Sequence, residues 1–110
     1  MIDNPDDLKN FIVKALEERK ADNIVVIPLQ DDVPLAKYMI FASGRSVKNI
    51  SAMAEYLALE LKHSAYVKPS VEGLKGSDWV LLDAGDVIVH LFHPETRAHL
   101  KLEELWARKK

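Results

Sequence analysis

The stretch from Trp79 to Phe92 constrains the fold of this chain more than any other part of the sequence. It reads Trp-Val-Leu-Leu-Asp-Ala-Gly-Asp-Val-Ile-Val-His-Leu-Phe, so two apolar runs flank an acidic segment that contains glycine. Residues 79–82 and 87–92 are rich in the β-branched and aromatic residues that favour strands, and residues 83–86 have the composition of a turn. The stretch therefore predicts a β-hairpin with a charged tip.

Both predicted strands are apolar on both of their faces. Successive strand residues point to opposite sides, which places one apolar set on each side of the second strand: Val87, Val89 and Leu91 on one, and Ile88, His90 and Phe92 on the other. This pattern predicts a sheet that is covered on both faces. Polar chemistry is concentrated at Asp83 and Asp86, and this favours a recognition edge over a catalytic cleft.

The composition is that of one small globular domain. The 110 residues are 48% hydrophobic and 29% charged, which suffices for a core and argues against disorder. The formal net charge of −2 and the absence of Cys argue against a general nucleic-acid binder, a disulfide framework and a thiolate metal site. The first residues lack a signal or targeting pattern, and no apolar run approaches the roughly 20 residues of a membrane span. We therefore expect a cytoplasmic protein without membrane contact.

Helix and strand signals alternate along the chain. Asn4 and Pro5 predict the start of a helix that continues to about Lys20. We then expect a buried strand at 24–27, a loop at 29–36, a strand at 38–42, a helix from 47 to about 62, a strand at 65–68, a loop at 69–78, the hairpin, and a terminal helix at 102–109. This order, αββαβββα, predicts an α/β fold: a single domain over residues 1–110, with one mixed sheet of about five strands and helices on its faces.

An enzymatic site is one hypothesis for the polar residues. The segment Ser43–Ser46 joins a strand to a helix and could hold a phosphate, while Asp83 and Asp86 could hold a divalent metal, as in a metal-dependent nucleotidyltransferase that also uses Ser43. The spacing argues against it, because these two carboxylates are an odd number of residues apart and flank a turn. Capping of the following helix is the simpler interpretation of Ser43–Ser46.

The histidines and tryptophans also have two interpretations each. His90 and His93 point to opposite faces of a strand, so we expect no metal site, and His90 is expected to pack within the sheet. Trp79 and Trp106 fit either the core or a protein interface. Trp79 is the better interface candidate, because in the predicted hairpin it lies close to the acidic turn and interfaces use aromatic anchors ringed by charge.

The hairpin and the chain beyond it resemble the ribosomal silencing factor (Iojap-like) family. Family sequences carry a pattern like Trp-x-Leu-Leu-Asp-Tyr-Gly-Asp-Val-x-Val-His-x-Phe, then an Arg, then Leu-Glu-x-Leu-Trp. The matching positions here are Trp79, Leu81, Leu82, Asp83, Gly85, Asp86, Val87, Val89, His90, Phe92, Arg97, Leu102, Glu103, Leu105 and Trp106. The segment from Ala36 to Ala54 is similar to a second family pattern. The chain departs from these patterns at Lys37, Lys48-Asn49, Ala84 and Leu100-Lys101. These departures concern the details of partner contact more than membership of the family.

This resemblance implies a nucleotidyltransferase-like fold and a regulatory function without catalysis. It implies binding to the large ribosomal subunit through ribosomal protein number fourteen and steric blocking of subunit joining, which represses translation when nutrients are scarce. A role in ribosome assembly, contact with ribosomal RNA and formation of a homodimer are further expectations. We expect no catalytic residue, no metal ligand and no cofactor, and we expect these partner-binding residues: Trp79, Asp83, Gly85, Asp86, Arg45 and Lys48.

Overall fold

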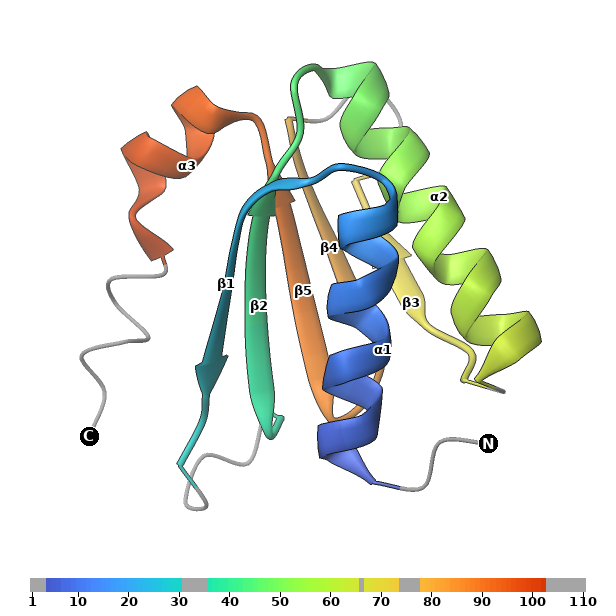
Figure 1. Ribbon diagram of the computed structural model, residues 1–110. Helices are drawn as coiled ribbons and strands as arrows, with labels where there is room; N and C mark the ends of the chain where they lie inside the picture. The colour runs from blue at the N-terminus through green and yellow to red at the C-terminus, as the bar shows by residue number, and fades with distance from the viewer. Residues whose placement is uncertain (1–3, 31–35, 66, 74–77, 103–110) are drawn as a thin grey trace.

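The computed structural model describes residues 4–30, 36–65, 67–73 and 78–102 (Figure 1). Their elements are α1 (Pro5–Glu18), β1 (Asp22–Pro28), β2 (Tyr38–Ser43), α2 (Val47–Ser64), β3 (Ser70–Glu72), β4 (Trp79–Asp83), β5 (Val87–Phe92) and α3 (Pro94–Leu100). The predicted order of helices and strands is therefore confirmed. Within these residues no helix is long and apolar enough to cross a membrane.

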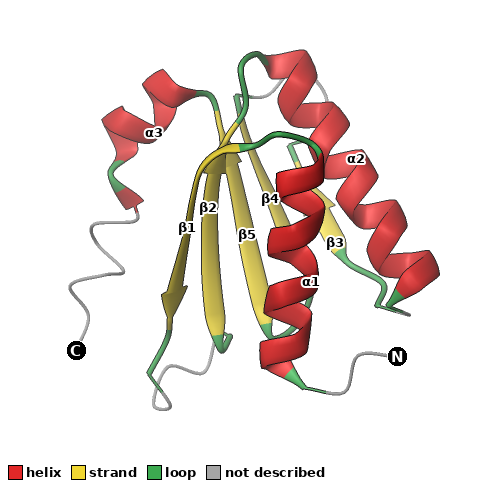
Figure 2. Ribbon diagram, viewed as in Figure 1, coloured by secondary structure: helices red, strands yellow, loops and turns green. Residues whose placement is uncertain are grey.

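The five strands form one mixed sheet in the order β1-β2-β5-β4-β3. β2 and β5 are parallel, and the other neighbouring pairs are antiparallel. Helices α1 and α2 lie side by side on one face of this sheet (Figure 2). The predicted mixed sheet of about five strands with helices is confirmed, and the hairpin β4–β5 provides two of its inner strands.

Helix α1 begins where the sequence predicts. The Asn4 side chain accepts a hydrogen bond of 2.8 Å from the Asp7 backbone N–H, and Pro5 occupies the first turn. An oxygen-bearing side chain at this position satisfies one of the backbone donors that a helix start leaves free. Its buried residues, Leu8, Ile12, Ala15 and Leu16, recur at helical spacing and face the sheet. Capping and amphipathic spacing together therefore place this helix.

The start of α2 is fixed by a cap and by a close approach to the end of β2. Ser46 accepts a 3.0 Å hydrogen bond from the Asn49 N–H. Just before it, a Cβ atom on Gly44 would lie 2.6 Å from Met53 Cε and 2.8 Å from Ile50 Cγ1. Glycine is thus favoured there, because any larger residue would force the side chains of Met53, Ile50 and Asn49 on α2 to shift.

The two faces of the sheet bury different side chains. Under α1 and α2 the strands contribute mostly aliphatic residues, Ile40, Ala42, Val80, Leu82, Val87, Val89 and Leu91. The opposite face carries a second cluster, Ala36, Met39, Phe41, Ile88 and Phe92, with Trp79, Leu81 and Leu102 packed against it. The alternation predicted for the hairpin is confirmed, and His90 lies on the second face with a relative exposure of 5%.

Two predicted elements differ from the structure, and one observed helix was not predicted. The first strand is only half-buried, because it forms an edge of the sheet with β2 as its single neighbour. A strand at 65–68 is wrong: β3 is Ser70–Glu72, in the predicted loop, because pairing with β4 selects those residues. Helix α3, Pro94–Leu100, was not predicted from the sequence. The predicted helix at 102–109 and Trp106 fall outside the described residues, apart from Leu102.

Candidate partner-binding surface

Trp79 is held in place at the start of β4 by its neighbours on β5. Its indole N–H donates a 3.1 Å hydrogen bond to His90 Nδ1. Its ring stacks on His90 and on Phe92, with centroids 5.9 and 5.5 Å apart. The side chain is half-buried, so part of a rigid aromatic surface remains open to a partner. These contacts fix the orientation of the indole, which limits the entropy that binding would cost.

His90 acts as the support behind Trp79. Its ring stacks on Phe41 with centroids 4.9 Å apart, and its Nε2 lies 3.0 Å from Met39 Sδ. Burial lowers the pKa of His90 to about 4, because an apolar site disfavours the charged form. A neutral ring that accepts a hydrogen bond at Nδ1 carries its proton on Nε2. The expectation that His90 packs within the sheet is confirmed.

A shallow cleft of about 300 Å³ opens beside Trp79. Its lining consists of Glu72 and Gly73 at the end of β3, together with Trp79 and Leu81 on β4. Leu81, Glu72 and Gly73 are not among the residues that the sequence predicts to bind a partner. Leu81 could have been found, since it lies two residues after Trp79 and therefore shares its strand face. Glu72 could not, because it reaches the cleft through its pairing with Leu81.

The acidic turn at the other end of the hairpin is closed by local hydrogen bonds. Asp83 Oδ1 accepts a 2.8 Å bond from the Gly85 N–H, and the Ala84 N–H donates a 2.9 Å bond to the Val87 carbonyl. Gly85 has φ +92°, a conformation that favours glycine. Asp83, Gly85 and Asp86 are all exposed. The turn therefore presents two carboxylates to solvent, as predicted.

Trp79 and the acidic turn lie at opposite ends of the hairpin, so the predicted closeness of the two is wrong. Trp79 pairs with Phe92, whereas Asp83 pairs with Ile88, a separation of four strand residues or about 13 Å. Trp79, Leu81 and Asp83 nevertheless alternate along one face of β4. One partner of ordinary size could contact all three, because specific interfaces bury about 800 Å² on each side.

Arg45 and Lys48 lie at the Trp79 end of the sheet, at the junction of β2 and α2. Both side chains are exposed. The Gly44 N–H donates to the Phe92 carbonyl at 3.0 Å, and the Arg45 N–H donates to Asn49 Oδ1 at 2.9 Å. These donors are thereby used within the protein, and the interpretation of Ser43–Ser46 as a helix cap is confirmed. Helix α2 covers the sheet face opposite to the one that carries Trp79. Arg45 and Lys48 therefore do not form one patch with the acidic turn.

The residues of the enzyme hypothesis do not converge. Ser43 pairs with Phe92 at one end of the sheet, while Asp83 and Asp86 lie at the other end. The Ser43 hydroxyl also accepts a 2.8 Å hydrogen bond from an Arg97 guanidinium nitrogen. Among the residues that the structure describes, no three His, Cys, Asp or Glu side chains are grouped to hold a metal ion. Ser43, Asp83 and Asp86 therefore do not form one common site in this structure.

Comparison with known proteins identifies the family of this chain. The family model described as "Ribosomal silencing factor during starvation" matches residues 2–110. The chain belongs to this family. A ribosomal silencing factor of Zymomonas mobilis is 43% identical over 103 residues, which cover 94% of this chain and 77% of that protein. A mouse protein named for mitochondrial assembly of the ribosomal large subunit is 34% identical, covering 88% of this chain and 44% of that protein.

Solved structures share the same architecture. A crystal structure from Chromobacterium violaceum matches with a TM-score of 0.90 at 32% sequence identity, covering 98% of this chain and 90% of that one. A structure from Bacillus halodurans matches with a TM-score of 0.78 at 31% identity, covering 92% and 94% of the two chains. The α/β fold with its mixed sheet is therefore shared with these two proteins.

Proposed function

We propose that this protein binds the large ribosomal subunit through ribosomal protein number fourteen and sterically prevents the small subunit from joining. The observation that carries the proposal is the family match over residues 2–110. In this proposal the protein acts in the cytoplasm without catalysing a reaction, and it represses translation when nutrients are scarce. The name of the mouse relative, which refers to assembly of the large subunit, supports a second role in ribosome assembly.

The outer face of β4 and the acidic turn form the proposed contact surface. Trp79 and Leu81 supply a half-exposed apolar centre, and Asp83 and Asp86 supply negative charge at its edge. Aromatic centres with charged rims are typical of protein interfaces. A basic ribosomal protein would complement the two carboxylates, which would speed its approach.

Arg45 and Lys48 have a different proposed role. They are exposed cations near the start of α2, away from the acidic turn. Ribosomal RNA adjoins ribosomal proteins on the subunit surface, and Lys and Arg bind phosphate through charge. We assign them to contact with RNA phosphates beside the protein partner.

Occupancy alone suffices for this mechanism. The domain measures 35 × 33 × 21 Å along its principal axes. A rigid body of that size, bound where the two subunits must meet, excludes the small subunit without any chemical step. An interface of about 1,200–2,000 Å² would give specific binding.

The test is sedimentation of the purified protein with isolated large subunits, followed by a subunit-joining assay. We expect the protein to pellet with large subunits, to stay in solution with small subunits, and to reduce the yield of joined ribosomes. Large subunits that lack ribosomal protein number fourteen should not bind it. Failure to pellet with intact large subunits at moderate salt would overturn the proposal.

A further inference from the structure

The cleft beside Trp79 brings an aromatic ring, an aliphatic side chain and a carboxylate together on one sheet face. Glu72 on β3 pairs directly with Leu81 on β4, so their side chains point to the same side of the sheet. Trp79 lies two residues before Leu81 and shares that side. Trp79 and Glu72 are thus diagonal neighbours, whose Cα atoms lie about 7–8 Å apart. Gly73 lines the cleft without adding a side chain.

One face of the Trp79 indole is directed toward this cleft. His90 and Phe92 on β5 stack against the ring at interplanar angles of 28° and 29°. In the sheet β4 lies between β5 and β3, and the cleft borders the ring from the side of β3. The face opposite the stacked neighbours therefore borders the cleft. Aromatic faces carry partial negative charge, and they attract cations that approach within about 6 Å of the ring centre.

The carboxylates near Trp79 differ in how they are engaged. Asp78 Oδ2 accepts a 2.6 Å hydrogen bond from the Thr96 hydroxyl, and Asp83 Oδ1 accepts a backbone N–H within the turn. Glu72 is exposed and has no hydrogen-bond or ion-pair partner within the described part of the chain. A carboxylate with open acceptor positions, next to an aromatic face and an aliphatic side chain, favours a flat cation as its ligand.

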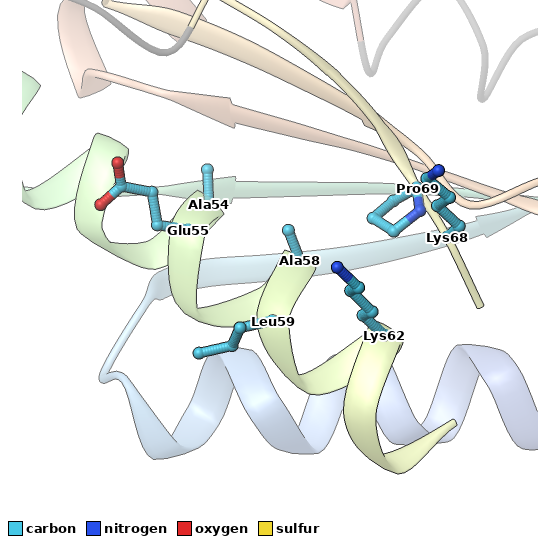
Figure 3. Close-up of a pocket in the computed structure, with 7 residues that line it drawn as sticks. All are labelled: Ala54, Glu55, Ala58, Leu59, Lys62, Lys68 and Pro69. Carbon is cyan, nitrogen blue, oxygen red and sulfur yellow. The ribbon is translucent and has the colours of Figure 1, made fainter. Parts of the chain in front are cut away.

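A groove on α2 shows the contrasting case (Figure 3). Its volume is about 320 Å³, against about 300 Å³ for the cleft. Leu59 is 55% exposed there, and Lys62 and Lys68 lie toward one end, with Glu55 toward the other (Figure 3). Among the described residues, no aromatic side chain lines this groove. Two hollows of similar size thus differ in chemistry, because a cation meets two lysines in the groove and a carboxylate with an aromatic ring in the cleft.

We propose that the cleft is a socket for one arginine side chain of the protein partner, whose guanidinium lies on the Trp79 indole and donates hydrogen bonds to the Glu72 carboxylate. Leu81 then contacts the methylene groups of that arginine. Arginine fits better than lysine, because its guanidinium is planar, stacks on aromatic rings and donates in a fork that matches a carboxylate. The inference rests on the proposed function for the identity of the partner, and it makes Glu72 a specificity-determining residue of that surface.

The socket can be tested without the ribosome, by ¹H–¹⁵N NMR titration of the full chain with the peptide acetyl-Gly-Arg-Gly-amide. The chain has two Trp residues, so the Trp79 indole N–H is identified by its loss in Trp79→Phe. We expect this resonance and the backbone amides of Glu72 and Gly73 to shift on titration. Peptides with citrulline or Lys in place of Arg should bind roughly tenfold more weakly, because citrulline lacks the charge and Lys lacks the planar fork. The Leu59 amide in the α2 groove should not shift.

Removal of the Glu72 charge gives a second readout. Glu72→Gln should weaken binding of the arginine peptide and of large subunits by roughly tenfold each, because it replaces a charge-assisted contact with a neutral one. Glu17→Gln makes the same change of charge at an exposed position on α1, and it should leave both affinities unaltered. Melting temperatures of the two variants, measured alongside, should match that of wild type, since both positions are exposed.

The socket is overturned if Glu72→Gln binds the arginine peptide as tightly as wild type does. It is also overturned if the citrulline peptide, or acetyl-Gly-Leu-Gly-amide, shifts the same resonances as strongly, because the cleft would then select for shape or apolarity in place of charge. A wild-type chain that pellets with large subunits but shows no shift with the arginine peptide would remove the socket and leave the proposed function standing. Peptide binding without pelleting would support the socket and remove the proposed function.

Discussion

The two ends of the β4–β5 hairpin are stabilised in different ways. At the Trp79 end, side chains from β2, β4 and β5 stack on one another, and the indole N–H is bonded to His90. At the acidic end, Asp83, Ala84 and Gly85 make hydrogen bonds within the turn itself. The Lys37 and Tyr38 N–H groups also donate to the Asp86 carbonyl at 2.8 and 3.1 Å. One end thus depends on stacked side chains from three strands, and the other depends on backbone hydrogen bonds within the turn and to the start of β2.

This difference suggests separate tasks for the two ends in ribosome binding. A side chain whose rotamer is fixed by buried neighbours loses little freedom on binding, so Trp79 suits an anchor. Exposed carboxylates on a turn act over a longer range and mainly affect the rate of encounter. Changes at the Trp79 end should therefore alter stability and affinity, while changes at the acidic end should alter association rate.

The largest expected effect is the pH dependence of stability caused by His90. Its pKa is about 4 in the folded protein against an ordinary value of 6.5. Above pH 6.5 the His90 ring is neutral in both the folded and the unfolded protein. Between pH 6.5 and pH 4 the unfolded protein takes up a proton on this ring and the folded protein does not. Falling pH therefore removes about 3 kcal/mol of stability over this window.

The measurement is urea denaturation at several pH values for wild type and for His90→Gln. Gln keeps an acceptor for Trp79 but does not titrate, so the stability advantage of wild type should shrink by about 3 kcal/mol between pH 7 and pH 4. His63→Gln, at an exposed position on α2, serves as the matched control and should change with pH as wild type does. A constant difference between wild type and His90→Gln would contradict the role given to burial.

The next effect concerns affinity. Trp79→Ala should weaken binding to large subunits by about 2 kcal/mol or more, roughly 30-fold, because it removes the aromatic centre of the proposed surface. Melting temperature must be measured alongside, since the ring also stacks on His90 and Phe92. Leu59→Ala, an exposed apolar truncation on the other sheet face, should leave subunit binding unchanged. Unaltered binding with a large loss of stability would assign Trp79 to the core alone.

The fold could be predicted from the sequence where local signals determine it. Asn4, Pro5 and Ser46 act on neighbouring backbone groups. The continuous apolar run of β5 indicates two buried faces without reference to any other strand. β3 could not be placed in this way, because its three residues are defined by pairing with β4. Helix α3 is short, and its cap is His93, which is not among the usual capping residues.

The candidate surface shows the same limit. The acidic turn was predictable because Asp83 and Gly85 belong to one turn. The support of Trp79 was not, since Met39 and Phe41 lie about forty residues earlier and reach His90 only through the parallel pairing of β2 with β5. The start of β4 also lies far from the turn, because Trp79 pairs with Phe92 at the end of β5 whereas Asp83 pairs with Ile88 at its start.

A smaller effect is expected at Gly85. A Cβ atom there would meet nothing within 4 Å, but the residue has φ +92°. Gly85→Ala should therefore lower stability by about 1–2 kcal/mol through backbone strain alone. Gly85→Asn should cost less, because Asn tolerates positive φ better. Thermal denaturation of the two variants checks this, and equal stability of Gly85→Ala and wild type would show that the turn relaxes.

The smallest effect should come from the charges of the acidic turn. Asp83→Asn/Asp86→Asn keeps an oxygen at position 83 that can accept the Gly85 N–H, so stability should change by no more than about 0.5 kcal/mol. Association with large subunits should slow severalfold at low salt, because these carboxylates attract a basic partner from a distance. Raising the salt should remove the difference, since screening acts beyond about 10 Å at 0.1 M. Stopped-flow measurement of association and dissociation rates at two salt concentrations separates the two contributions. If the double variant instead dissociates faster at both salts, Asp83 or Asp86 makes a direct contact with the partner, and the acidic end is an anchor as much as the Trp79 end is.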